Sequence, residues 1–289
     1  MEGLGPIGTK AQNLRGVLLH GTMAVTPAGV PLGHLHQMLW ARSDEEEKLS
    51  AAEKKKRPIK EKESYKWIES LQAISKQQPE GTQVVSVCDA ESDVYELLAE
   101  AEKLDAAYLI RAAQDRSVID PEVRTLRPAL LKRAPKAQLT IAVSAKKNEP
   151  KRQARVAVRY RKLQLKAPYR PQQPGHKPLP SLTVYAILVR EENPPKGMTR
   201  VEWLLLTNVP INQIEDALER IEWYCQRWQI EIFHKILKSG CRIEHRRLKN
   251  VSRLQPCIAL FSIIAWRIHW LTNCLLYTSD AADDETSVG

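Results

Sequence analysis

The sequence predicts an α/β protein, because strand patterns and helix patterns alternate along the chain. Short apolar runs at 84–88 (VVSVC) and 106–111 (AAYLIR) flank a helical pattern, which is typical of a buried sheet covered by helices. Between 112 and 206, the runs LTIAVSA, RVAVRYRKLQL, LTVYAILVRE and VEWLLLT are separated by Pro-rich turns and indicate antiparallel strands. Residues 211–237 contain neither Gly nor Pro and predict one long helix.

The other elements follow in order. The stretch 16–40 predicts a hairpin, because two apolar runs surround a Pro-Ala-Gly-Val-Pro turn. Residues 62–76 predict a helix, and another helix is expected to begin at Glu91 or Ser92. The long helix has Asn212 as its expected cap, and a second apolar helix is predicted over 254–274.

Charge points to a polyanionic partner. The chain has 289 residues, enough for a sizeable core, and a net charge of +10. Eleven Lys or Arg residues lie in 146–177 against the single acid Glu149, and five lie in 242–253 against Glu244. Such basic runs favour nucleic acid over a small acidic metabolite.

Cysteine usage and hydropathy indicate a cytoplasmic protein. The five cysteines are scattered and form no C-x-x-C pair, so we expect reduced core residues. The longest apolar run, 257–266, is shorter than a membrane span, and the N-terminus shows no signal-peptide pattern. No membrane partner is therefore expected.

The segment 224–238, YCQRWQIEIFHKILK, carries the chemistry. At about 100° per residue, its polar positions fall within an arc of roughly 80°, beside an apolar stripe. The polar positions are Tyr224, Arg227, Glu231, Lys235 and Lys238; the stripe is Ile214, Leu218, Ile221, Cys225, Trp228, Ile232 and Ile236. A carboxylate among cations suits a site where the carboxylate binds a metal and the cations bind phosphates. The alternative is a solvated face on which Glu231 and Lys235 form an ordinary ion pair.

Asp89 is the second candidate carboxylate. It follows the predicted strand at 84–88, and open α/β sheets place their sites at this carboxyl edge. Together with Glu231 it could bind Mg²⁺, which prefers oxygen ligands and typically takes one or two protein carboxylates. The alternatives are an N-cap or turn role for Asp89 and a surface ion pair for Glu231. Asp93 is interpreted as a first-turn helix acid.

The chain resembles the cut-and-paste DDE transposases of insertion-sequence type four. Their signature Y-x-x-R-x-x-x-E-x-x-x-x-x-x-K matches Tyr224, Arg227, Glu231 and Lys238, with the frequent extra lysine at Lys235. The resemblance includes VCDAESD, YLIR, ENPPKG and WLLLTNVP, and extends over about 4–276. It implies a ribonuclease-H-like mixed sheet with helices and an inserted antiparallel β domain.

The resemblance also implies roles for individual residues. Asp89 and Glu231 are similar to the second and third catalytic acids, which bind Mg²⁺, with Mn²⁺ as a substitute. The DNA-binding residues are expected to be Tyr224, Arg227, Lys235, Lys238, Trp203 and Arg111. Trp203 matches an aromatic that stacks on a flipped base, although a simple core role is the alternative. For Arg111 the alternative is an ion pair at the sheet edge.

The domains expected from this resemblance are 1–111 and 207–276 for the catalytic core, 112–206 for the inserted β domain, and 277–289 for a disordered or adventitious tail. The family's first Asp has no counterpart here, so we expect a fragment that is inactive alone. The partners implied are double-stranded DNA, as transposon ends and target, and a second copy of the parent, whose dimerisation region is not matched. The setting is bacterial, cytoplasmic and nucleoid-associated. A non-catalytic DNA-binding remnant, or a ribonuclease-H-like nuclease without strand transfer, is the alternative.

Overall fold

The computed structural model divides the chain into two compact units. Unit 1 comprises Met1–Lys56 and Cys225–Gly289, and unit 2 comprises Arg57–Tyr224. The described residues are 3–8, 12, 14–44, 49–143, 145, 149–169, 178–246, 248 and 250–285.

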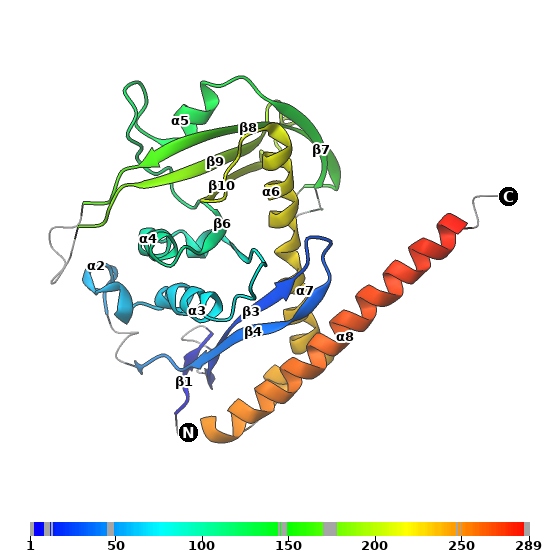
Figure 1. The fold of residues 1–289 in the computed structure, drawn as a ribbon. Helices are drawn as coiled ribbons and strands as arrows, with labels where there is room; N and C mark the ends of the chain where they lie inside the picture. The colour runs from blue at the N-terminus through cyan, green and yellow to red at the C-terminus, as the bar shows by residue number, and fades with distance from the viewer. Residues whose placement is uncertain are drawn as a thin grey trace. The chain divides into compact units, whose positions relative to one another are not determined.

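Unit 2 is built on a curved six-stranded sheet with the order β5-β6-β10-β9-β8-β7 (Figure 1). β5 and β6 run parallel, with Cys88 opposite Ile110, and the other neighbouring strands are antiparallel. The strands are β5 (Val85–Cys88), β6 (Ala107–Arg111), β7 (Ala137–Val143), β8 (Arg152–Leu165), β9 (Leu182–Glu191) and β10 (Glu202–Thr207).

Both faces of this sheet are apolar, which explains why its strands read as nearly continuous apolar runs. One face packs Tyr108 and Leu204 against α3, α4 and α5. The other packs Leu109 and Leu205 against α6. The helices are α3 (Tyr65–Ser75), α4 (Tyr95–Lys103), α5 (Leu126–Leu131) and α6 (Ile214–Gln226), with the short 3₁₀ turns η2 (Ile59–Glu61) and η3 (Ala90–Ser92).

The mixed sheet with helices confirms the α/β class and is consistent with a ribonuclease-H-like fold. The strands expected for an inserted domain continue the same sheet, because β10 pairs directly with β6 through Leu205 and Arg111. Residues 112–206 therefore do not form a separate sheet among the described residues. The four expected domain ranges stay a prediction.

Unit 1 contains the predicted hairpin, which pairs β3 with β4. The hairpin contacts α8 through two hydrogen bonds, from Gln37 to Ser262 (2.9 Å) and from the Trp266 indole to the Pro31 carbonyl (3.0 Å). The elements are β1 (Gly5–Ile7), β2 (Leu14–Gly16), β3 (Leu18–Val25), β4 (Pro31–Trp40), α2 (Ala51–Lys56), α7 (Trp228–Lys235), the π-helical turn η4 (Ile236–Gly240), the 3₁₀ turn η5 (Ile243–His245) and α8 (Val251–Glu285).

The prediction of one continuous helix over 211–237 is wrong, because the helix is interrupted. α6 ends at Gln226, α7 begins at Trp228, and the chain then enters the π-helical turn η4. The predicted apolar stripe is wrong at two positions, since Cys225 is exposed and Trp228 is 59% exposed. The expected Asn212 cap is also corrected, because the Asp216 carboxylate accepts the Asn212 amide (2.8 Å) and the Gln213 amide.

α8 begins three residues before the predicted start of the second apolar helix and ends at Glu285. It includes 277–285 of the expected tail, while 286–289 lie outside the described residues. The segment Val251–Cys274 contains an 18-residue window with a mean hydropathy of 1.3 and is long enough to cross a membrane. The expectation that no segment reaches that length is wrong by this measure, although core helices of soluble proteins also meet it. The absence of a membrane partner stays a prediction.

Candidate active site

Asp89 lies directly after β5, at the carboxyl end of the strand. Its backbone is extended, and its Oδ1 accepts a hydrogen bond from the Glu91 amide (2.9 Å) that begins the turn η3. The capping role weighed as an alternative is therefore real. Among the described residues, no hydrogen-bond donor contacts the second carboxylate oxygen, which leaves one oxygen for a ligand.

The neighbouring thiol is not part of the chemistry. Cys88 lies immediately before Asp89 and its side chain is turned toward the core. Burial, and then the Asp89 carboxylate, raise the pKa of Cys88 to about 12, against a weaker effect of the Ser92 hydrogen bond. The thiol is therefore neutral near pH 7 and is neither a nucleophile nor a metal ligand there.

The structure brings Arg111 to the same end of the sheet as Asp89. β5 and β6 are parallel, and Cys88 lies opposite Ile110, so Asp89 follows alongside Arg111 on a strand roughly 5 Å away. Arg111 donates to the Glu202 carbonyl (3.3 Å). Arg111 thus makes a hydrogen bond to the backbone instead of the ion pair considered as an alternative. The carboxylate of Glu202 is left to other partners.

Trp203 and Tyr224 lie on the face of the sheet that carries Val85 and Val87. Side chains alternate along a strand, so Asp89 falls on this face too. The Trp203 and Tyr224 rings are 5.9 Å apart, and Tyr224 is only 7% exposed. The expectation that the phenol belongs to an exposed polar arc is wrong, since its ring is part of the core. The DNA roles of both residues stay predictions.

The other predicted residues belong to unit 1. Arg227 pairs with Glu231 at 2.7 Å, one helical turn apart, and the Glu231 side chain is 37% exposed. Glu231 thus forms its ion pair with Arg227, and not with Lys235 as the alternative considered. Lys238 lies in η4 and pairs with Glu244 at 3.2 Å. A π-helical turn is frequent at functional sites and changes the direction of the side chains that follow.

Sequence reasoning missed the role of Asp93, which is structural. Its carboxylate accepts the amides of Ala113 (2.8 Å) and Gln114 (3.0 Å) and pairs with Arg116 at 2.6 Å, with 1% of its side chain exposed. Arg116 also donates to the Asp93 carbonyl. We call these contacts the Asp93 latch. The latch joins the segment that follows Asp89 to the segment that follows Arg111. It therefore holds these two segments at a fixed distance from each other.

A group of histidines in unit 1 was also missed. The His34 ring lies 4.3 Å from Phe233, and both of its nitrogens are buried without a hydrogen-bond partner. Burial, and then the charges of His234 and His269, lower the pKa of His34 to about 4. The pKa values of His234 and His269 are lowered as well, mainly by burial. No pattern of the sequence announces this group, because its members come from three elements.

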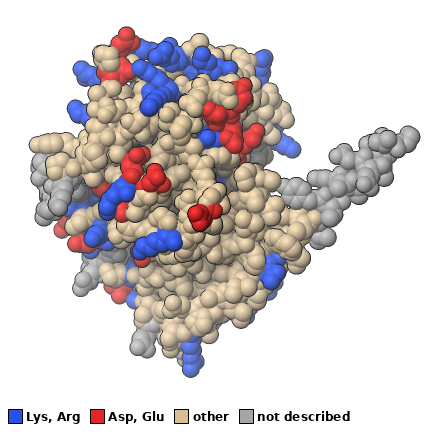
Figure 2. All heavy atoms as spheres, in the orientation of Figure 1, with Lys and Arg blue, Asp and Glu red and all other residues tan. Residues whose placement is uncertain are grey.

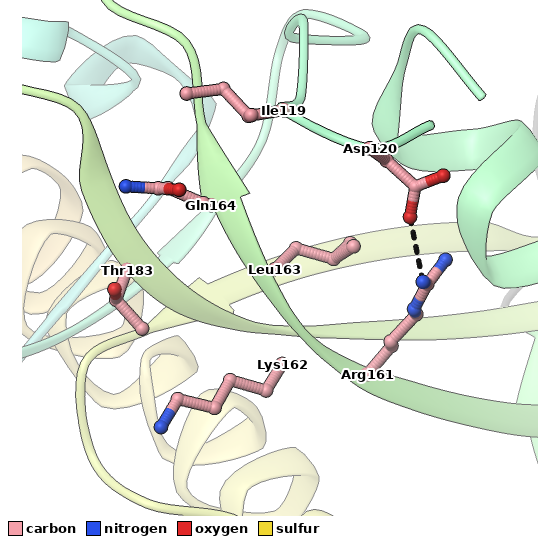
Figure 3. A pocket seen from close by; sticks show the side chains of 7 residues that line it. All are labelled: Ile119, Asp120, Arg161, Lys162, Leu163, Gln164 and Thr183. Carbon is pink, nitrogen blue, oxygen red and sulfur yellow. Dashed lines mark hydrogen bonds and ion pairs between the residues drawn. The ribbon is translucent and has the colours of Figure 1, made fainter. Parts of the chain in front are cut away.

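Unit 2 also has a hollow of about 300 Å³ on its surface (Figure 3). It is lined by Ile119, Asp120, Arg161, Lys162, Leu163, Gln164 and Thr183. Arg161 is paired with Asp120 at 2.6 Å. The Glu122 amide, and then the Val123 amide and Arg161, hold the pKa of Asp120 below its usual range. The hollow contains none of the predicted site residues. Of its two cations, Arg161 is neutralised by Asp120, and Lys162 lies over the Tyr185 ring at 5.6 Å.

Basic side chains gather at the top of Figure 2, over α5 and β8. Parts of the two basic runs lie outside the described residues, namely 146–148, 170–177, 247 and 249. The described cations that remain in these runs include Arg155 on β8 and Arg253 on α8. This distribution agrees with a surface that contacts a polyanion.

The family comparison assigns these residues to a known class. A family model described as "Transposase DDE domain" matches residues 60–263, more than two thirds of the chain. The chain therefore belongs to the transposase DDE domain family. This membership supports a transposase-type nuclease that binds DNA and takes part in transposition and recombination; the family generally uses divalent metal ions, typically Mg²⁺.

The carboxylates fit such an ion by their chemistry. Asp89 and Glu231 each have one oxygen engaged and one without a hydrogen-bond donor among the described residues. Carboxylate oxygens are the protein ligands that Mg²⁺ prefers. Within either unit, the described residues contain no group of three or more His, Cys, Asp or Glu side chains that could hold a metal. Asp93 is excluded as a ligand because the latch occupies both its oxygens.

Proposed function

We propose that this chain is the catalytic core of a cut-and-paste DDE transposase of insertion-sequence type four. The observation that supports it best is Asp89, a carboxylate at the carboxyl end of a sheet strand with one oxygen oriented and the other open, inside the matched domain. Glu231 is proposed as its co-ligand. The substrate is double-stranded DNA, both transposon ends and target, and the parent acts as a homodimer on bacterial nucleoid DNA in the cytoplasm.

The chain's own residues position DNA around these carboxylates. Arg111 lies on the strand next to Asp89 and donates to the Glu202 carbonyl. Arg227 orients Glu231 through their ion pair. Lys235 and Lys238 contact phosphates near the cleaved end, with Lys238 exchanging Glu244 for phosphate. Trp203 contributes an aromatic surface next to Tyr224. Bound Mg²⁺ would lower the pKa of the attacking water or 3′-hydroxyl and stabilise the leaving oxygen.

Iron-directed cleavage of the protein tests the shared ligation without requiring catalysis. Fe²⁺ with ascorbate and peroxide cuts the backbone next to the residues that bind it. We expect cuts beside both Asp89 and Glu231, suppressed by excess Mg²⁺, because the two carboxylates share the ion. Each of Asp89→Asn and Glu231→Gln should remove both cuts. The fragments are read by mass spectrometry.

Glu91→Gln is the matched control for this experiment. Glu91 is an exposed acid two residues from Asp89 whose side chain pairs with Lys66 (3.3 Å), so its loss should leave both cuts in place. Cuts beside Asp89 that persist in Glu231→Gln would show that Glu231 is not a co-ligand. If Mg²⁺ has no effect on the cuts, the proposed metal site is wrong.

A further inference from the structure

Two arginines converge on Glu202, the first residue of β10. Arg127, from α5, places Nε 2.8 Å from Oε1, and Arg190, from β9, places Nε 3.5 Å from Oε2. Arg111, from β6, donates to the backbone carbonyl of Glu202. We call Arg127, Arg190 and Glu202 the Glu202 cluster. Its side chains are between 24% and 33% exposed, so solvent and solutes can reach them.

The positive charge of the cluster exceeds what Glu202 can neutralise. One carboxylate faces two guanidiniums, with a third at its carbonyl. Among the described residues, one other acid contacts the cluster: the Asp115 carboxylate accepts the Arg127 backbone amide at 2.8 Å. Both arginines use Nε for Glu202. Among the described residues, their terminal Nη atoms donate no hydrogen bond. A guanidinium held at Nε presents two parallel Nη donors, the geometry that binds phosphate bidentately.

The position of the cluster extends the proposed DNA surface around the end of the sheet. Glu202 and Trp203 are consecutive on β10, so their side chains lie on opposite faces. Trp203 packs on the face of α6, whereas Glu202 lies on the face that carries Leu204 and α5. Arg111 lies between them, at the end of β6. A strand of DNA that contacts Arg111 can therefore continue onto the second face.

We propose that Arg127 and Arg190, oriented by Glu202, bind a backbone phosphate of DNA on the face opposite Trp203. This inference rests on the proposed function, because it assumes that unit 2 binds duplex DNA. The ordinary alternative is an ion-pair network that only connects α5, β9 and β10. That alternative leaves the Nη donors and the excess charge without a role, which is why the phosphate site is preferred.

The test is the salt dependence of duplex DNA binding by the full chain. Each phosphate contact contributes a slope of about −0.9 to log K against log salt. The double variant Arg127→Gln/Arg190→Gln should make the slope less negative by about 1, with an affinity loss on the order of tenfold near 0.1 M salt. Glu202→Gln should change binding in the opposite direction, since it adds a net positive charge and keeps an oxygen acceptor.

The matched control is Arg57→Gln/Lys103→Gln. It removes two charges from unit 2 at ordinary exposed ion pairs, with Glu61 (3.2 Å) and Glu100 (3.4 Å), and should leave the slope within error. Equal slopes for the wild type and the Arg127/Arg190 variant would overturn this inference while leaving the proposed function intact. No binding by the wild type would overturn both. Thermal melting verifies that the variants fold. If the double variant fails to fold, Arg190→Gln alone serves as the test, with a weaker affinity and a slope that is less negative than that of the wild type.

Discussion

Replacing Asp93 by alanine is expected to lower the free energy of unfolding of unit 2 by about 3–5 kcal/mol. The variant removes the partner of Arg116, whose side chain is 9% exposed, and leaves a charge buried without compensation. It also leaves the amides of Ala113 and Gln114 without their acceptor. Urea unfolding followed by circular dichroism measures the loss.

Two further variants make this expectation specific. Asp89→Asn keeps an oxygen for the Glu91 amide and should change stability by less than about 0.5 kcal/mol. Asp93→Asn/Arg116→Met removes both charges and should recover part of the loss, since a buried pair is often replaceable as a whole. A cost below about 1 kcal/mol for Asp93→Ala would mean that Arg116 reaches solvent and that the latch is not rigid.

Acidification should destabilise unit 1 through His34. The folded pKa of about 4 lies below the ordinary value of 6.5, so the unfolded chain binds more protons between these two pH values. The contribution of His34 to the free energy of unfolding is therefore complete above about pH 6.5. It is lost as the pH is lowered toward 4, by up to roughly 3 kcal/mol. The lowered pKa values of His234 and His269 add to the effect in the same direction.

Thermal melts between pH 4.5 and 7.5 measure this dependence. Comparing variants cancels the titration of carboxylates that are common to all of them. His34→Phe should flatten the curve, because it removes one group that gains a proton on unfolding. His245→Gln is the control, since His245 is exposed on η5 and should leave the curve unchanged. Identical curves for His34→Phe and the wild type would show that His34 does not drive the transition.

The parts of the fold set by local pattern were predictable from the sequence. The strand ending before Asp89 and the strand ending at Arg111 were predicted within one residue of β5 and β6. The hairpin of β3 and β4 was also predicted, because its Pro-Gly turn separates two apolar runs. These elements are defined by neighbours in the chain, and so the carboxyl edge that presents Asp89 could be placed in advance.

Features set by distant contacts could not be predicted in the same way. Tyr224 fits a polar arc by its spacing, yet packing with Trp203 buries it. The break between α6 and α7 and the turn η4 occur where no Gly or Pro signals an interruption until Gly240. Asp93 looked like a helix acid because its partner, Arg116, lies 23 residues away. Period and propensity contain no information about such partners.

The pairing of β10 with β6 has a consequence for synthesis of the chain. Tyr108 and Asn208, which are hydrogen-bonded at this junction, are 100 residues apart. A ribosome adds about 5–20 residues per second, so β6 waits roughly 5–20 s before its antiparallel neighbour exists. During that time one edge of β6 exposes unpaired amides and carbonyls, which other chains can add to. A chaperone that shields nascent β6 should therefore raise the soluble yield more than one added after release.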